Sequence, residues 1–209
     1  GNTKLLGGIW GEFRDSLIQR YGSAEALKTG WVSNHMFEPS IGAAIFSNMT
    51  TAEKNLDVFF ETPWQSVEKI GKGWKVSVLK DGNKRTIITS QIIDATELGD
   101  VAAAIGVPYY IGMDSKDRYN EAIAPPQGNN VIQDLTFVLI LKEYDQPVAI
   151  SKPEGYDPTL FYCATANKKC KDSTSVNRVL WAKDKMITYG KLPNKKYMIN
   201  WPINGNDFY

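Results

Sequence analysis

The chain has 209 residues, of which 43% are hydrophobic and 22% are charged, the balance of an ordinary globular protein. Its 24 basic and 23 acidic side chains leave a formal net charge of +1, so no strong field favours nucleic acid or an anionic membrane, and we expect a small-molecule partner. No apolar run approaches the roughly 18 residues of a membrane-spanning helix, and one histidine with two cysteines is too few for a four-ligand zinc site.

Two amphipathic helices are predicted in the first quarter of the chain. The first ends at Gly22, and its apolar residues recur every four positions at Ile9, Phe13, Leu17 and Tyr21. The second runs from about Pro39 to Lys54, because proline suits the first turn of a helix and an apolar stripe follows its face. That stripe consists of Phe37, Ile41, Ile45 and Met49.

Short strands are predicted next. Leu56–Phe60 and Ile92–Ala95 are apolar enough to be buried strands, and between them lies a three-stranded antiparallel meander with tight glycine turns. The meander strands are residues 64–69, 74–80 and 84–89. One or two helical turns should follow, with Asp100 as the N-cap and Gly106 just past the end. From about residue 108 the chain is β-rich, with its strongest β run at 135–141.

The turn after Ile92–Ala95 is the candidate ligand site. We expect the strands at Leu56–Phe60 and Ile92–Ala95 to be adjacent and parallel, and ligands of open α/β sheets lie beyond the carboxyl ends of such strands. Residues 96–100 would then face the ligand crevice. The alternative is that these residues only connect a strand to a capped helix.

An ordered set of motifs, spread over nearly the whole chain, resembles a bacterial FAD-dependent oxidoreductase family. The motifs are Gly7-Gly8-Ile9, Phe37-Glu38-Pro39, residues 55–62, residues 92–101, Ala124-Pro125, residues 133–137 and residues 200–207. The resemblance implies an α/β protein (α+β within this chain), with a partial FAD-binding Rossmann-like domain and inserted β-meander at 1–107. Residues 108–209 would be part of a β-rich substrate domain. The implied reaction is hydride transfer between FAD and a substrate, and no catalytic base is assigned.

The resemblance also implies which residues bind the cofactor. Trp64 would offer its backbone to the adenine ring, and the turn after the second strand would lie against the flavin nucleotide. The residues of that turn are Ala95, Thr96, Glu97, Gly99 and Asp100. Two nearby carboxylates repel a pyrophosphate, so we interpret Glu97 and Asp100 as acceptors for cofactor hydroxyls or as helix caps.

The glycine turn that binds the phosphates of FAD is not found in the sequence. The nearest approximation, residues 71–76, lacks the third glycine and falls in a hairpin. The chain also begins without methionine, so we expect an internal fragment of a larger enzyme that binds FAD poorly by itself. Such a fragment should self-associate through exposed sheet surface. The cellular compartment, and whether Cys163 and Cys170 form a disulfide, stay open.

The final residues are a second candidate site. Hydrogen-bonding side chains gather around an indole, which suits a polar or sugar-like substrate; they are Asn200, Trp201, Asn204, Asn206 and Asp207. A turn-rich loop capped by its own side chains would explain them equally well. The competing function is a non-enzymatic β-rich carbohydrate-binding module, which predicts a closed antiparallel β core. A hydrolase is disfavoured by the single histidine and the lack of a paired-carboxylate signature.

Overall fold

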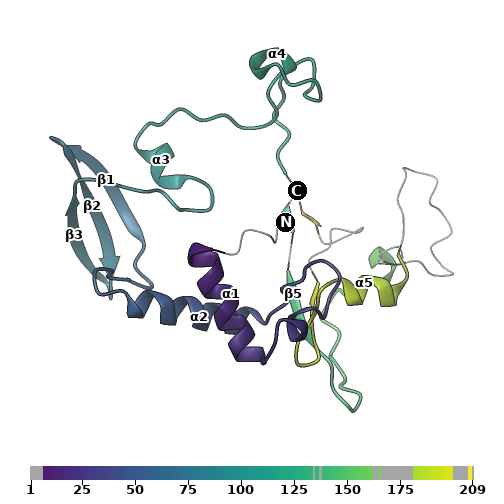
Figure 1. Cartoon of the computed structure of the whole chain (residues 1–209). Coiled ribbons are helices and arrows are strands. Elements are labelled where there is room, and N and C mark those ends of the chain that lie inside the picture. The colour runs from purple at the N-terminus through teal and green to yellow at the C-terminus, as the bar shows by residue number, and fades with distance from the viewer. Residues whose placement is uncertain are drawn as a thin grey trace. The chain divides into compact units, whose positions relative to one another are not determined.

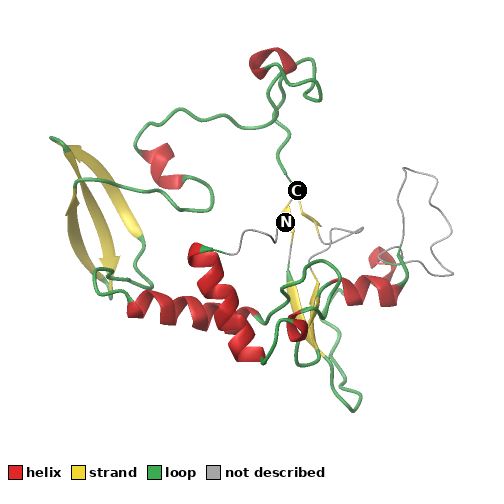
Figure 2. Ribbon diagram, in the orientation of Figure 1, coloured by secondary structure: helices red, strands yellow, loops and turns green. Residues whose placement is uncertain are grey.

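The computed structural model describes residues 7–133, 135–136, 138–161, 165, 181–199 and 207–208. The chain divides into two compact units. Unit 1 combines the residues up to Lys54 with those from Asp134 onward, and unit 2 is Asn55–Gln133. Figure 1 shows the elements in chain order, and Figure 2 shows them by type. Within the described part of the chain, every helix is too short or too polar to span a bilayer.

The two helices predicted for the start of the chain are confirmed. α1 spans Gly8–Tyr21 and ends at Gly22, whose φ of 89° is left-handed and whose N–H donates to the carbonyl of Ile18. α2 spans Pro39–Ala52, with its proline in the first turn. The helices cross one another within unit 1 (Figure 1).

The crossing buries the core of unit 1. Phe13 and Leu17 of α1 pack with Ile45 of α2 and with Leu27 of the short helix η1 (Glu25–Leu27). The Phe13 ring also stacks on Phe46, with 4.4 Å between the ring centroids. Partly buried side chains surround this cluster; they are Ile18, Tyr21, Phe37, Ile41 and Met49. The predicted apolar stripes therefore form this core, except for Ile9, which is 71% exposed.

The later part of unit 1 consists of short elements. An antiparallel sheet has the order β5-β7-β6, and β4 pairs with β8. The strands are β4 (Leu135–Thr136), β5 (Leu139–Lys142), β6 (Lys191–Leu192), β7 (Lys196–Ile199) and β8 (Asp207–Phe208), and the helices are η2 (Pro158–Phe161) and α5 (Lys183–Tyr189). The predicted β run at 135–141 is thus divided between two sheets. The Thr29 hydroxyl donates to the carbonyl of Lys191 and joins the two ends of the unit.

Unit 2 contains the predicted meander. β1 (Trp64–Ile70), β2 (Gly73–Lys80) and β3 (Asn83–Thr89) form an antiparallel sheet in that order. Asp81 and Gly82 are both left-handed, as a two-residue hairpin turn requires. Two short helices follow, α3 (Asp100–Ala104) and α4 (Lys116–Tyr119), and a β-bridge joins Met113 to Asn129.

The two buried parallel strands predicted on either side of the meander are not found, and that prediction is wrong. Residues 56–60 and 92–95 have no strand pairing, and Phe60 and Ile93 are 66% and 91% exposed. A strand is stabilised by main-chain hydrogen bonds to a neighbour, and among the described residues no segment pairs with either one. Apolar composition was therefore not sufficient to predict strands at these two segments.

The mixture of helices and antiparallel sheets confirms the α+β class expected for the chain. The described strands form sheets of three, two and three members, and none of these closes on itself. The closed β core of a carbohydrate-binding module is therefore not found in the described part of the chain. The FAD-binding domain at 1–107 and the substrate domain at 108–209 stay predictions.

Candidate functional site

The predicted cofactor turn is organised by the carboxylate of Asp94. Its Oδ1 accepts hydrogen bonds from the backbone N–H of Thr96 at 2.9 Å and from the Thr96 hydroxyl at 2.7 Å. Its Oδ2 accepts the N–H of Ala102 at 2.8 Å. The Thr96 Oγ in turn accepts the N–H of Asp100 at 2.8 Å. An aspartate followed two residues later by a threonine is a common local turn motif, and here it also holds the start of α3.

These bonds correct the predicted cap of α3. Gly99, with a left-handed φ of 72°, is the N-cap, and Asp100 is the first helical residue and makes no side-chain cap bond. Asp94 and Thr96 satisfy the N–H groups that an N-cap side chain would otherwise accept. The Thr96 hydroxyl, followed by the N–H groups of Ala102 and Thr96, lowers the pKa of Asp94 below its ordinary value.

The predicted cofactor residues divide into an exposed and a half-buried set. Ala95, Glu97 and Asp100 are exposed, whereas Thr96 and Gly99 are half-buried. Trp64 opens β1, where it pairs with Val78 beside a β-bulge. Among the hydrogen bonds of the described residues, none joins Trp64 to the turn at 94–102. The structure therefore brings the turn residues together and does not link Trp64 to them.

Several donors of this turn are already used within the chain, whereas two of its carboxylates are exposed. The N–H groups of Asp100 and Ala102 are already bonded within the turn, and that of Ala103 donates to Gly99. A phosphate therefore finds these donors engaged and meets two exposed carboxylates. Exposed carboxylates instead suit the hydroxyl groups or the N–H edge of a ligand. The turn therefore offers acceptors at Glu97 and Asp100, while several of its donors are used within the chain.

Most of the predicted substrate residues lie outside the described part of the chain. They are Asn200, Trp201, Asn204 and Asn206. Asp207 belongs to β8, where its backbone pairs with Thr136. Cys163 and Cys170 also lie outside the described residues.

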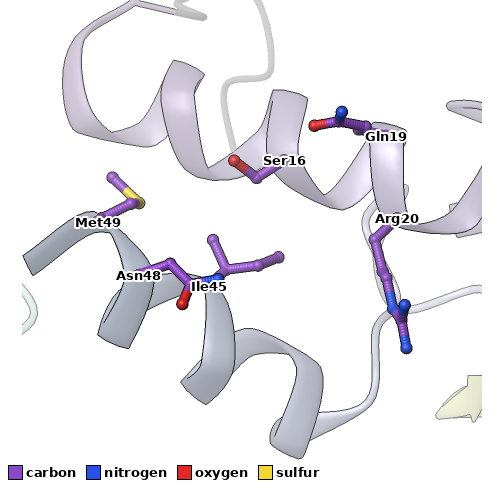
Figure 3. A pocket seen from close by; sticks show the side chains of 6 residues that line it. All are labelled: Ser16, Gln19, Arg20, Ile45, Asn48 and Met49. Atoms are coloured by element: carbon purple, nitrogen blue, oxygen red, sulfur yellow. The ribbon is translucent and has the colours of Figure 1, made fainter. Parts of the chain in front are cut away.

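A pocket of about 410 Å³ lies between α1 and α2 in unit 1 (Figure 3). α1 contributes the upper wall of the view and α2 the lower one. The lining residues are Ser16, Gln19, Arg20, Ile45, Asn48 and Met49. Arg20 is the only charged group among them, and a guanidinium does not exchange its proton near neutral pH. The pocket therefore offers hydrogen bonds and a positive charge but no general base, and no predicted site residue lines it.

Sequence reasoning also missed a buried acid. Glu38 is only 6% exposed, directly before α2. Its carboxylate is bonded by the ammonium of Lys196, the amide of Asn194 and the hydroxyl of Tyr21. The bond from Lys196, ahead of those from Asn194 and Tyr21, lowers the pKa of Glu38 below its ordinary value, and burial opposes this. The carboxylate is enclosed by the chain's own donors, so we interpret it as a structural group that links the start of α2 to the β6–β7 hairpin.

Among the described residues, no group of three or more His, Cys, Asp or Glu side chains is placed to hold a metal ion. A signal for Asp94 did exist in the sequence, since Asp-x-Thr spacing is typical of a side-chain turn. No comparable local signal existed for Glu38, because Asn194 and Lys196 lie 156 and 158 residues away.

A family model described as FAD dependent oxidoreductase matches residues 1–209, which include the turn and the Glu38 cluster. The chain belongs to this family. The match confirms the resemblance seen in the ordered motifs and makes FAD the cofactor of the family. No curated protein and no solved structure matches the chain.

Proposed function

We propose that this chain contributes to an enzyme that transfers hydride between FAD and a polar or sugar-like substrate, and that the turn at 94–102 contacts the flavin nucleotide. The proposal rests on a chain of the FAD-dependent oxidoreductase family in which this turn is held by its own side chains and exposes the carboxylates of Glu97 and Asp100. Bound FAD would supply the two-electron acceptor. The substrate would lose a hydride from carbon and a proton from oxygen, and the proton would pass to a base or to water.

The chain's own residues would bind and orient the cofactor. Glu97 and Asp100 are exposed and would accept hydrogen bonds from cofactor hydroxyls, because carboxylates are pure acceptors at neutral pH. The backbone of Ala95 and Gly99 would approach the nucleotide closely. Trp64 would offer its backbone to the adenine ring, as the family resemblance implies. The segment 200–207 would hold the substrate through its amide and indole groups.

We further propose that the 209 residues alone bind FAD weakly and are inactive. The sequence contains no Gly-x-Gly-x-x-Gly turn before a helix, and the N–H groups at the start of α3 are already engaged. The pyrophosphate would then depend on polypeptide beyond these residues.

The test is to express the full reading frame of the gene and record its visible spectrum. A flavoprotein shows bands at about 370 and about 450 nm, which come from the flavin itself. Adding FAD to the purified 209-residue chain should leave flavin fluorescence unchanged, whereas the full product should quench it. A full product that carries no flavin and gives no response to added FAD would rule the proposal out.

A further inference from the structure

Within the turn at 94–102, the residues that hold the backbone differ from those exposed to a ligand. Asp94 and Thr96 make the side-chain hydrogen bonds, whereas Ala95, Glu97 and Asp100 are exposed. We propose that Asp94 is the positioning residue of the cofactor turn, and that it acts through Thr96 without touching FAD. This inference rests on the proposed function of the turn.

Asp94 is poorly placed to be a ligand itself. Both carboxylate oxygens already accept hydrogen bonds from the protein, two on Oδ1 and one on Oδ2, and the residue is half-buried. Its negative charge also lies against the first N–H groups of α3, where the helix dipole favours an anion. Each carboxylate oxygen therefore has a protein partner before any cofactor arrives.

Thr96 transmits the constraint through its hydroxyl, which donates to Asp94 and accepts from Asp100. Residues 95–99 thus lie between two fixed points, the Asp94 carboxylate and the start of α3. Gly99 completes the turn with a left-handed φ of 72°, which other residues adopt at a cost. A nucleotide would meet a backbone that is already ordered, so binding would require less loss of conformational entropy.

The chain contains a matched copy of this motif that serves as a control. In unit 1, Asp157 Oδ1 accepts the N–H of Thr159 at 2.8 Å and its hydroxyl at 2.7 Å. The spacing, the two bonds between aspartate and threonine, and the direction of the pKa shift of the aspartate are the same as at Asp94, whereas the bonds to Asp100 and Ala102 belong to the turn at 94–102. The family resemblance assigns no cofactor contact to Asp157. Replacing it removes the same aspartate–threonine hydrogen bonds from another place in the chain.

The experiment uses the full reading frame loaded with FAD. The variants are Asp94→Ala, Asp94→Asn, Thr96→Val, Thr96→Ser and the control Asp157→Ala. FAD affinity is measured by quenching of flavin fluorescence, and the N–H groups of Asp100 and Ala102 are followed by hydrogen exchange. We expect Asp94→Ala and Thr96→Val to weaken FAD binding about tenfold or more and to speed exchange at both N–H groups.

The conservative variants separate positioning from folding. Thr96→Ser keeps the hydroxyl and should restore binding to within about twofold of the parent, whereas isosteric Thr96→Val should not. Asp94→Asn keeps the acceptor for Thr96 and should fall between the parent and Asp94→Ala. If Asp94→Ala proves too unstable to purify, the serine and valine pair decides the matter alone.

The outcomes also distinguish this inference from the proposed function. Faster exchange with unchanged FAD affinity in Asp94→Ala or Thr96→Val would overturn the positioning role while leaving the flavoenzyme intact. An equal loss of affinity in Asp157→Ala would overturn it too, because the effect would not be specific to this turn. A parent protein that binds no FAD would remove both proposals together.

Discussion

Replacing Lys196 by methionine should destabilise unit 1, because it leaves the buried carboxylate of Glu38 without its cation. Asn194 and Tyr21 would still donate hydrogen bonds. Removing one partner of a fully buried ion pair costs about 3–5 kcal/mol. The Lys196 side chain is 30% exposed, so water reaches this pair and weakens it. We therefore expect the free energy of unfolding to fall by about 2–3 kcal/mol.

The assay is urea unfolding followed by far-UV circular dichroism, which reports α1 and α2. With a urea dependence of about 2 kcal/mol per molar, the midpoint should fall by about 1 M or slightly more. Lys195→Met is the matched control in the same hairpin. Lys195 pairs with Asp145, and both side chains are largely exposed. The control should therefore cost less than about 1 kcal/mol.

The same comparison predicts a pH dependence. Because the folded-state pKa of Glu38 lies below its ordinary value of 4.5, the contribution of the pair is complete above pH 4.5. It is lost as the pH falls through the lowered folded value. The difference between the parent and Lys196→Met should therefore shrink on acidification. Two results would refute this reasoning. One is equal destabilisation by Lys195→Met and Lys196→Met at neutral pH, and the other is a stability difference between the parent and Lys196→Met that does not change with pH.

Three further predictions concern other parts of the chain. Leu17→Ala, at a fully buried position, should cost about 3 kcal/mol of unfolding free energy in urea, whereas exposed Ile9→Ala should change little. Burial and then the guanidinium of Arg14, which donates to the imidazole, lower the pKa of His35 below 6.5. The stabilising contribution of neutral His35 is complete above pH 6.5 and is lost as the pH falls through the lowered folded value. On acidification, the free energy of unfolding of the parent should therefore decline more steeply than that of His35→Gln. Parallel pH profiles of the two proteins would contradict this. Self-association through exposed apolar residues should weaken in Ile93→Asp, seen as a lower average mass in light scattering; a monomeric parent at high concentration would remove the premise.

Elements coded by local signals were predicted well from the sequence. The four-residue spacing through Phe13 and Leu17 specifies one face of a helix, and a proline at position 39 specifies where the next helix begins. The meander follows from glycine turns between β-forming segments, because each strand finds its partner within a few residues. These signals act over short windows and need no knowledge of the rest of the chain.

Strand predictions that rested on apolar composition alone were less successful. Residues 56–60 and 92–95 have the composition of buried strands, but strand formation requires a neighbour, and composition does not specify one. The β run at 135–141 was predicted in the right place, but the sequence did not show that it divides into β4 and β5, which pair with different strands.

The candidate site shows the same division. The sequence located the turn at 96–100, but it assigned the cap to Asp100 when Asp94 and Thr96 satisfy the N–H groups there. Two of the three donors to the carboxylate of Glu38, Asn194 and Lys196, lie more than 150 positions away, and no short window of sequence contains that information.

The division of unit 1 between the two ends of the chain has a consequence during synthesis. A ribosome that adds about 5–20 residues per second needs on the order of 10 s to pass from Lys54 to Lys196. Unit 2, which is contiguous, is released meanwhile and is free to fold. Through that interval Glu38 lacks two of its three donors, Asn194 and Lys196, because only Tyr21 precedes it in the chain. The helix pair can collapse early, but it can enclose its carboxylate fully only after Asn194 and Lys196 have been synthesised.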